Sequence, residues 1–163
     1  MVYSYPCLTP LGEAVLYERD GALFQLYFPG DPFRPDSRRE QTPLLGEAAA
    51  QLIEYFQGTR RTFTVPLAPA GPEFYQRVWQ TMLQEVPYGS TISYGRLAEI
   101  SGYPRAARAV GTANRRCPLP IFIPCHRVIA AGGRLGGYGN VEQKRFLLTM
   151  EAKFAPNFEP VHS

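Results

Sequence analysis

Apolar residues near the start of the chain follow the two-residue period of β-strands. Residues 14–17 and 22–28 predict two strands, and Asp20-Gly21 between them is a strong signal for a hairpin turn. Residues 29–41 are rich in proline, aspartate and arginine, which predicts a surface loop. The pattern therefore predicts an antiparallel strand pair followed by an irregular connection.

The hydrophobic pattern then changes to that of an amphipathic helix. Thr42 is a suitable N-cap, Pro43 fits the first helical position, and Gly58 ends the pattern. Residues 62–65 predict one more strand. This half carries no cluster of reactive residues, so we interpret it as a scaffold. The apolar positions of the predicted helix are Leu44, Leu45, Ala48, Ala49, Leu52, Ile53 and Phe56.

A proline-rich stretch, residues 66–72, predicts a linker to a second domain. Pro72 can start a helix whose apolar face extends to Val86, and the segment 87–89 ends it. Trp79 lies on that face, where an aromatic residue at helical spacing is far more often part of a core than a ligand platform.

Two short helices follow, separated by a glycine-containing turn. Ser93 predicts the N-cap of the first helix and Gly102 its end, and residues 105–114 predict the second helix. This order is typical of a helix-turn-helix motif. Small residues on the second helix allow its backbone to approach a nucleic-acid groove.

The formal net charge of +3 is unevenly distributed. Residues 1–80 are slightly acidic, whereas residues 96–134 carry a block of arginines with Glu99 as the only acid. Such a block is the electrostatic footprint of a polyanion partner, although a solvated surface face is an alternative. We expect DNA contacts from Arg105, Arg108, Ala109, Gly111 and Arg115.

The apolar run of residues 120–123 predicts a buried strand that leads into Pro124-Cys125-His126-Arg127. From these residues alone, a core cysteine stays open as an interpretation. However, His126 can act as a base and Arg127 supplies positive charge. Both favour the thiolate over a free thiol with its pKa of about 8.5. We therefore predict a reactive thiol.

The C-terminal part combines glycine-rich loops with a last helix. Residues 128–135 predict a hairpin-like wing around a Gly-Gly pair, and the Gly-Tyr-Gly loop at 136–139 allows close approach to a flat ligand. Asn140 caps the last helix, and Glu151 falls in its final turn. An acid there opposes the helix dipole, so it needs a partner or costs stability.

Composition narrows the functional classes. In 163 residues the chain has three cysteines without paired CxxC spacing and two histidines, His126 and His162. We therefore expect free thiols in a reducing compartment, and neither a metal nor a cofactor. No apolar run approaches the roughly 18 residues of a membrane span, and no secretory signal is evident. The predicted location is cytoplasmic, on the nucleoid in a prokaryote.

The motif 120–128 resembles the active-site signature of the 6-O-alkylguanine-DNA alkyltransferases, also called methylated-DNA-protein-cysteine methyltransferases. The similarity extends from about Phe74 to Phe154, with several motifs in the family's order. The N-terminal half matches only in layout, which the resemblance identifies with a ribonuclease-H-like domain. The further matching segments are Arg77-Val78-Trp79, Val86-Pro87-Tyr88-Gly89, Ser93-Tyr94, Ala106-Ala107-Arg108-Ala109-Val110-Gly111 and Leu147-Leu148.

The resemblance implies roles for individual residues in the reaction. Cys125 is the alkyl acceptor, His126 takes the thiol proton through a water, and Glu151 orients His126. Adjacent residues on a strand point to opposite sides, which agrees with a water between Cys125 and His126. Arg108 fills the base stack when the damaged guanine is flipped out, and Tyr94 helps to rotate the nucleotide.

The resemblance also implies contacts to the flipped base. The backbone carbonyls of Cys125 and Val128 accept from the guanine amino group. Tyr138 forms a wall of the pocket, and the backbone N–H of Gly139 approaches the guanine oxygen. Lys144 matches a lysine near the pocket.

Two positions depart from the family pattern. Cys117 replaces an asparagine that ties the recognition helix to the active-site strand, and a thiol is a weak donor and acceptor. We expect Cys117 to lie near Cys125, where it competes for oxidation. Gly139 stands where some members carry serine, so a hydroxyl contact is lost and the substrate range can differ.

The predicted fold is α+β. It combines a ribonuclease-H-like α/β domain at 1–70 with a mainly helical winged helix-turn-helix domain at 71–155 and a tail at 156–163. The predicted function is irreversible, stoichiometric transfer of the alkyl group from 6-O-alkylguanine, and from 4-O-alkylthymine, in double-stranded DNA to Cys125. We expect a monomer and leave cooperative binding on DNA open. A non-catalytic sensor of alkylated DNA and a winged-helix regulator remain alternatives, with a cysteine hydrolase more distant.

Overall fold

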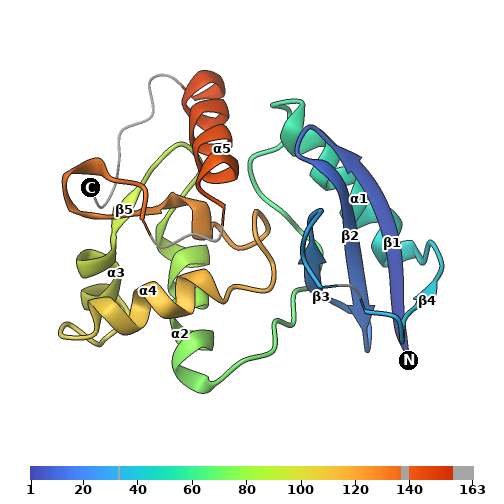
Figure 1. Ribbon diagram of the computed structural model, residues 1–163, viewed down its shortest axis with the longest axis horizontal. Helices are drawn as coiled ribbons and strands as arrows, with labels where there is room; N and C mark the ends of the chain where they lie inside the picture. The colour runs from blue at the N-terminus through green and yellow to red at the C-terminus, as the bar shows by residue number, and fades with distance from the viewer. Residues whose placement is uncertain (33, 137–139, 156–163) are drawn as a thin grey trace. The chain divides into compact units, whose positions relative to one another are not determined.

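The computed structural model describes residues 1–32, 34–136 and 140–155, and the chain divides into two compact units, residues 1–70 and 71–163 (Figure 1). The first unit is a sheet with a helix, and the second is mainly helical. The predicted mixed α+β class is confirmed. No helix in the described ranges is both long and apolar enough to cross a membrane.

In the described part of the first unit, four strands form one sheet in the order β3-β2-β1-β4. The strands are β1 (Val2–Thr9), β2 (Gly12–Arg19), β3 (Ala22–Tyr27) and β4 (Arg38–Arg39). β1 and β3 both pair with β2 in antiparallel register, and β4 pairs with β1 in parallel. The predicted hairpin turn is confirmed, since Asp20 and Gly21 have φ values of 53° and 77°.

Helix α1 (Pro43–Phe56) packs against the sheet and begins as predicted (Figure 1). The Thr42 hydroxyl accepts from the backbone N–H of Leu45, and Pro43 occupies the first helical position. The apolar side of α1 and the inner face of the sheet form the core of this unit. Its buried members include Leu16, Leu23, Leu45, Leu52 and Tyr55.

The strand predicted at residues 62–65 does not form. The buried Gln51 side chain instead pairs with the polar groups of Thr64. Its amide donates to Thr64 Oγ1 (2.6 Å) and accepts from Thr64 N (3.0 Å). Only the following residues join the sheet, through an isolated bridge between Leu23 and Leu67. The alternating sequence pattern was therefore misleading, because a side chain rather than a neighbouring strand supplies the hydrogen bonds.

The second unit is built on α2 (Glu73–Glu85), α3 (Tyr94–Ile100), α4 (Ala107–Arg115) and α5 (Val141–Phe154). α3 and α4 pack together as the predicted helix-turn-helix pair, and both contact α2. Trp79 is buried, as predicted, and its indole N–H donates to Ala113 O (2.9 Å), which fixes α4 on α2. The Ser93 and Asn140 side chains cap α3 and α5 as expected.

Between α4 and α5 the chain departs from the prediction in two places. Residues 120–123 form a tight turn with a bridge between Pro120 and Ile123, not a strand. The wing also differs, because β6 (Val128–Ile129) pairs in parallel with β5 (Ile92–Ser93) and not with residues 134–135. The bond from Ala130 N to Arg134 O (2.7 Å) links the two sides of the predicted hairpin, and Gly133 N donates to Ala130 O (3.2 Å) in the turn between them.

Candidate active site

Cys125 begins a short 3₁₀ helix, Cys125–Arg127, that follows directly on the tight turn. The residue is buried, and its backbone N–H donates to Ile123 O (2.7 Å). Ile121 in the turn has a φ of 75°, which is rare for a β-branched residue and costs on the order of 1–3 kcal/mol. Tight packing must hold this conformation, because Ile121 is itself 1% exposed.

The surroundings of the Cys125 sulfur favour its ionised form. A hydrogen bond from Cys117 lowers the pKa of Cys125, burial raises it, and the charge of Lys144 lowers it, with a net downward shift. The backbone N–H groups of Ile121 and Cys125 add to the same effect. The prediction that Cys117 lies near Cys125 is confirmed, and the thiol at 125 has the character of a nucleophile.

His126 and Glu151 form a buried pair. His126 Nε2 lies 2.6 Å from Glu151 Oε2, and both side chains are at most 1% exposed. Burial lowers the pKa of His126 despite the nearby carboxylate, so we assign a neutral ring that donates from Nε2. Nδ1 is then the basic nitrogen, and it is buried without a hydrogen-bond partner among the described residues.

Arg127 completes the site around the same carboxylate. Its Nε donates to Glu151 Oε1 (2.8 Å), its Nη2 to Glu151 Oε2 (3.0 Å), and its Nη1 to Val86 O (2.9 Å). Gly89 N also donates to Glu151 Oε1 (3.2 Å). The expectation that Arg127 supplies charge to the thiolate was wrong, because the buried guanidinium pairs bidentately with Glu151.

These donors determine the charge of Glu151. Burial raises the pKa of this carboxyl group, but the charges and hydrogen bonds of His126 and Arg127 lower it to well below its usual range. Glu151 therefore has the partners that its place in the final turn of α5 requires. The sequence signal for the Gly89 contact was the Val86-Pro87-Tyr88-Gly89 motif, although the motif alone does not show which group it contacts.

Lys144 supplies the positive charge beside Cys125. Its ammonium group is buried on α5 and donates to the carbonyls of Val128 (2.5 Å), Leu135 and Gly136 (2.9 Å). Burial lowers the pKa of Lys144 to about 8, and the negative charge on Cys125 opposes this shift. Lys144 thus holds the loop after β6 in place while it stabilises an anion at position 125.

Tyr94 lies near Lys144 in the second unit. Its ring is 5.8 Å from Lys144 Nζ, and Cβ atoms built on Gly111 and Gly136 would lie 3.8 and 3.9 Å from it. Burial raises the pKa of Tyr94, which keeps the phenol neutral, and the Asn114 side chain next to it opposes the shift. Sequence reasoning missed Asn114. Tyr138 and Gly139, the predicted wall and donor, lie outside the described residues.

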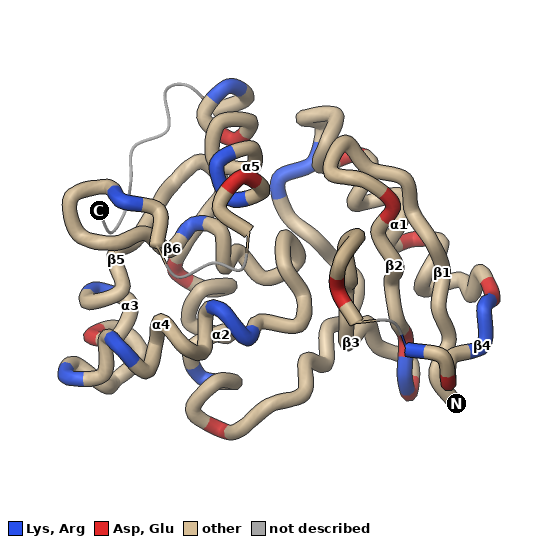
Figure 2. Tube along the Cα trace, in the orientation of Figure 1, with Lys and Arg blue, Asp and Glu red and all other residues tan. Residues whose placement is uncertain are grey.

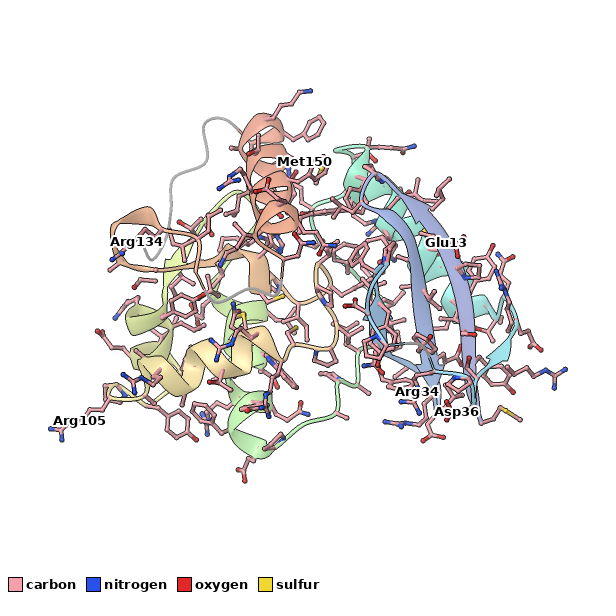
Figure 3. The ribbon with its side chains drawn as sticks, viewed as in Figure 1. Glu13, Arg34, Asp36, Arg105, Arg134 and Met150 are labelled. Carbon is pink, nitrogen blue, oxygen red and sulfur yellow. The ribbon has the colours of Figure 1, made fainter. Side chains whose placement is uncertain are left out.

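The predicted DNA contacts lie mainly on the open face of α4 (Figure 2). Arg108, Ala109 and Arg115 are exposed there, whereas Gly111 is buried against Tyr94 and is not part of this face. Arg105 lies in the turn before the helix, and Figure 3 shows its side chain pointing away from the unit. The exposed face is basic, and Figure 2 shows Lys and Arg positions on α4 and in the turn before it.

The 3₁₀ geometry changes one sequence-based argument. Because Cys125 and His126 are not on a strand, strict alternation of side chains does not separate them. A water between the two remains a proposal that rests on the unpartnered Nδ1. Within the ranges described, no group of three or more His, Cys, Asp or Glu residues could hold a metal ion.

Two family models match the sequence. The model for the 6-O-methylguanine DNA methyltransferase ribonuclease-like domain matches residues 1–69, and that for the DNA binding domain of the same methyltransferase matches residues 73–153. The constitutive methylated-DNA–protein-cysteine methyltransferase of Bacillus subtilis is 42% identical over 159 residues, which span 93% of this chain and 96% of that protein. The chain belongs to the 6-O-methylguanine DNA methyltransferase family.

Solved structures agree with this family assignment. The O6-methylguanine methyltransferase of Mycobacterium tuberculosis has a TM-score of 0.87 and 39% identity, with 97% of both chains covered. A crystal structure of Mycobacterium tuberculosis OGT in complex with DNA has a TM-score of 0.86, with 95% of this chain and 96% of that chain covered. The family resemblance inferred from the sequence motifs is therefore confirmed.

The buried Glu151 cluster leads to a prediction about stability. We expect Glu151→Gln to lower the free energy of unfolding of the second unit by about 3–5 kcal/mol at neutral pH, because Arg127 would keep a buried charge without its partner. The pKa of Glu151 is depressed in the folded state, so its contribution is complete above the ordinary value of 4.5 and is lost as the pH falls below it. The difference from wild type should therefore shrink on acidification, as measured by urea unfolding at several pH values.

Glu142→Gln is the matched control. Glu142 is on the same helix and pairs with Arg145 at 2.7 Å, but both side chains are exposed. We expect a change of less than about 0.5 kcal/mol. Equal effects of the two substitutions would contradict the central role of the Glu151 cluster.

Proposed function

We propose that the chain repairs alkylated DNA by direct reversal, with transfer of the alkyl group from 6-O-alkylguanine to the sulfur of Cys125. The observation that carries this proposal is a buried cysteine of lowered pKa beside a buried His126–Glu151 pair. Relatives across most of the chain's length are named methylated-DNA–protein-cysteine methyltransferases, which supports the same reaction. The thiolate can displace an alkyl group from the exocyclic O4 of thymine in the same way, which makes 4-O-alkylthymine a second proposed substrate.

The reaction needs only groups of this chain and the substrate. His126 Nδ1 takes the thiol proton, through a water, while Glu151 holds the ring in the required tautomer. The Cys125 thiolate attacks the alkyl carbon, the S–C bond forms, and the C–O bond breaks with its electron pair on the guanine oxygen. The proton lost by the thiol balances the one that guanine gains.

The product explains a single turnover. The sulfur of Cys125 ends in a thioether, which is a poor leaving group. Neither His126 nor Lys144 can provide a nucleophile that would remove the alkyl group from sulfur at a useful rate. One molecule of protein is therefore consumed for each lesion repaired, and the stoichiometry of transfer is one.

Nucleotide flipping provides access to the buried site. The alkylated oxygen lies inside the duplex, so the nucleotide must leave the stack at a cost of a few kcal/mol. The exposed Arg108 on α4 is suited to occupy the space left in the stack, and Arg105 and Arg115 are suited to contact phosphates. We propose that α4 binds double-stranded DNA as the recognition helix.

Backbone carbonyls are proposed to recognise the flipped base. Val128 O already accepts from Lys144, and Cys125 O accepts from Val128 N, but each carbonyl has a second lone pair for the guanine amino group. Tyr94 provides an aromatic face beside them. Tyr138 and Gly139 are proposed to complete the pocket.

The two alternative functions leave parts of the site without a purpose. A damage sensor without transfer does not need a cysteine of lowered pKa next to a buried base. A winged-helix regulator that reads sequence needs neither Cys125 nor the His126–Glu151 pair. The transferase accounts for all three residues.

Mass spectrometry tests the proposed function. After the protein is mixed with a duplex that contains one 6-O-methylguanine, we expect one methyl group on the Cys125 peptide and restoration of normal guanine. Cys125→Ala should bind the same duplex without a mass change. Tight binding by the wild type without transfer would support the damage sensor, and neither binding nor transfer would support the regulator.

Arg108→Ala tests flipping separately from chemistry. Because the arginine is proposed to replace the flipped base in the stack, we expect transfer from duplex DNA to slow by about 10-fold or more. Transfer from a single-stranded oligonucleotide should change much less, since it has no stack to fill. Single-turnover rates on the two substrates give the comparison.

Arg116→Ala serves as the control for charge. Arg116 is exposed at the C-terminal end of α4. Its replacement removes one positive charge, as Arg108→Ala does, but at the opposite end of the helix. It should weaken binding with a smaller salt dependence but leave the duplex-to-single-strand ratio unchanged. If Arg108→Ala behaves in the same way, Arg108 contacts only phosphate and the flipping role is wrong.

A further inference from the structure

The loop after β6, residues 130–136, is held in place on both sides of Arg134, and we call it the wing loop. Before the arginine, Ala130 N donates to Arg134 O (2.7 Å) and closes a tight turn. After it, the buried ammonium group of Lys144 donates to Leu135 O, the next carbonyl along the chain. The backbone of Arg134 is therefore fixed, and little conformational entropy remains to be lost there when a ligand binds.

The side chain of Arg134 is exposed, and Figure 3 shows it pointing away from the second unit. Two other exposed arginines of this unit are bound to carboxylates. Arg96 pairs with Glu99 at 3.0 Å, and Arg145 pairs with Glu142 at 2.7 Å. Within the ranges that the structure describes, Arg134 takes part in no ion pair. Its charge is therefore available to a partner outside the chain.

The wing loop is attached to the elements that carry the candidate site. A Cβ atom built on Gly136 would lie 3.9 Å from the Tyr94 ring. Lys144, which holds the loop, also acts on Cys125 through its charge. At the base of the loop, β6 pairs with β5, and β5 leads directly into α3. A molecule bound by the loop would thus be held in a fixed position relative to the thiol.

The composition of the wing loop favours a phosphate as the partner. The chain reads Ala-Gly-Gly directly before Arg134, so no polar side chain there can join the guanidinium in reading a base edge. A single exposed guanidinium is suited to a phosphate oxygen, and such a contact positions a duplex without reading its sequence. This property agrees with repair, because a lesion can occur in any sequence.

We propose that Arg134 binds a backbone phosphate of the DNA duplex and anchors it at the wing loop, apart from the contacts of α4. The choice of DNA as the partner rests on the proposed function. In the view of Figure 3, Arg134 and Arg105 project from the same edge of the second unit. The wing loop and the recognition helix would then hold the duplex at two places, with the nucleotide to be flipped between them.

The salt dependence of DNA binding tests this proposal. For Arg134→Ala we expect about fivefold weaker binding to an undamaged duplex at low salt, and a slope of log K against log salt that is smaller by about 1. Arg134→Lys keeps the charge and should restore the slope. The single-turnover rate of transfer at saturating DNA should stay nearly unchanged, because Arg134 does not touch the thiol. The fold should also be kept, since the replaced side chain is exposed.

Arg145→Ala is the matched control. It removes one exposed positive charge from the same unit, but this arginine already pairs with Glu142. Its slope should equal that of the wild type. An unchanged slope in Arg134→Ala would overturn the proposal, as would an equal decrease in Arg145→Ala, because overall charge alone would then explain the effect. A smaller slope in Arg134→Ala, together with a wild type that transfers no alkyl group, would keep the phosphate contact and reject the proposed function.

Replacement of single phosphates locates the contact on the DNA. In a set of duplexes, one phosphate at a time is replaced by a neutral methylphosphonate. Wild-type binding should weaken at one position where Arg134→Ala is insensitive, whereas Arg115→Ala should become insensitive at a different position. If every replacement weakens Arg134→Ala as much as the wild type, Arg134 has no phosphate partner and the proposal is wrong.

Discussion

The buried carboxylate of Glu151 is the group on which the site depends. It would be costly to bury alone, and the end of a helix is an unfavourable place for an acid. His126 and Arg127 donate to it from the 3₁₀ helix, and the backbone N–H of Gly89 donates to it from the loop after α2. The carboxylate therefore fixes α5, the 3₁₀ helix and the loop after α2 to one another. Because Arg127 balances its charge, His126 can stay neutral and keep a basic nitrogen.

The nucleophile is prepared by position as much as by charge. Ile121 adopts an unfavourable backbone conformation that directs its N–H toward the Cys125 sulfur. The buried Lys144 adds a cation and at the same time holds three carbonyl groups of the following loop. Strain and desolvation both cost stability, and they persist because surrounding packing over-determines the turn.

Local sequence signals predicted the elements that are fixed by local chemistry. Ser93 and Asn140 cap their helices with the expected side-chain bonds, because capping involves residues close in sequence. The strand predictions failed for two different reasons, because a distant side chain supplies the hydrogen bonds of one segment and the other segment closes on itself, with Ile123 N donating to Leu119 O. Gln51 satisfies the segment around Thr64, and the left-handed Ile121 turns an apolar run into a tight loop.

In the candidate site, too, the residue types could be predicted from the sequence but their pairing could not. Residue types indicated a thiol, a base and an acid, and the acid near the end of α5 was expected to need a partner. Pairing could not be deduced in the same way, because Arg127 is adjacent to the thiol in sequence but binds Glu151 in space. Lys144, distant in sequence, takes the place beside Cys125. A buried guanidinium matches a carboxylate in a bidentate geometry, so the arginine pairs with Glu151 and the charge that acts on Cys125 comes from the lysine.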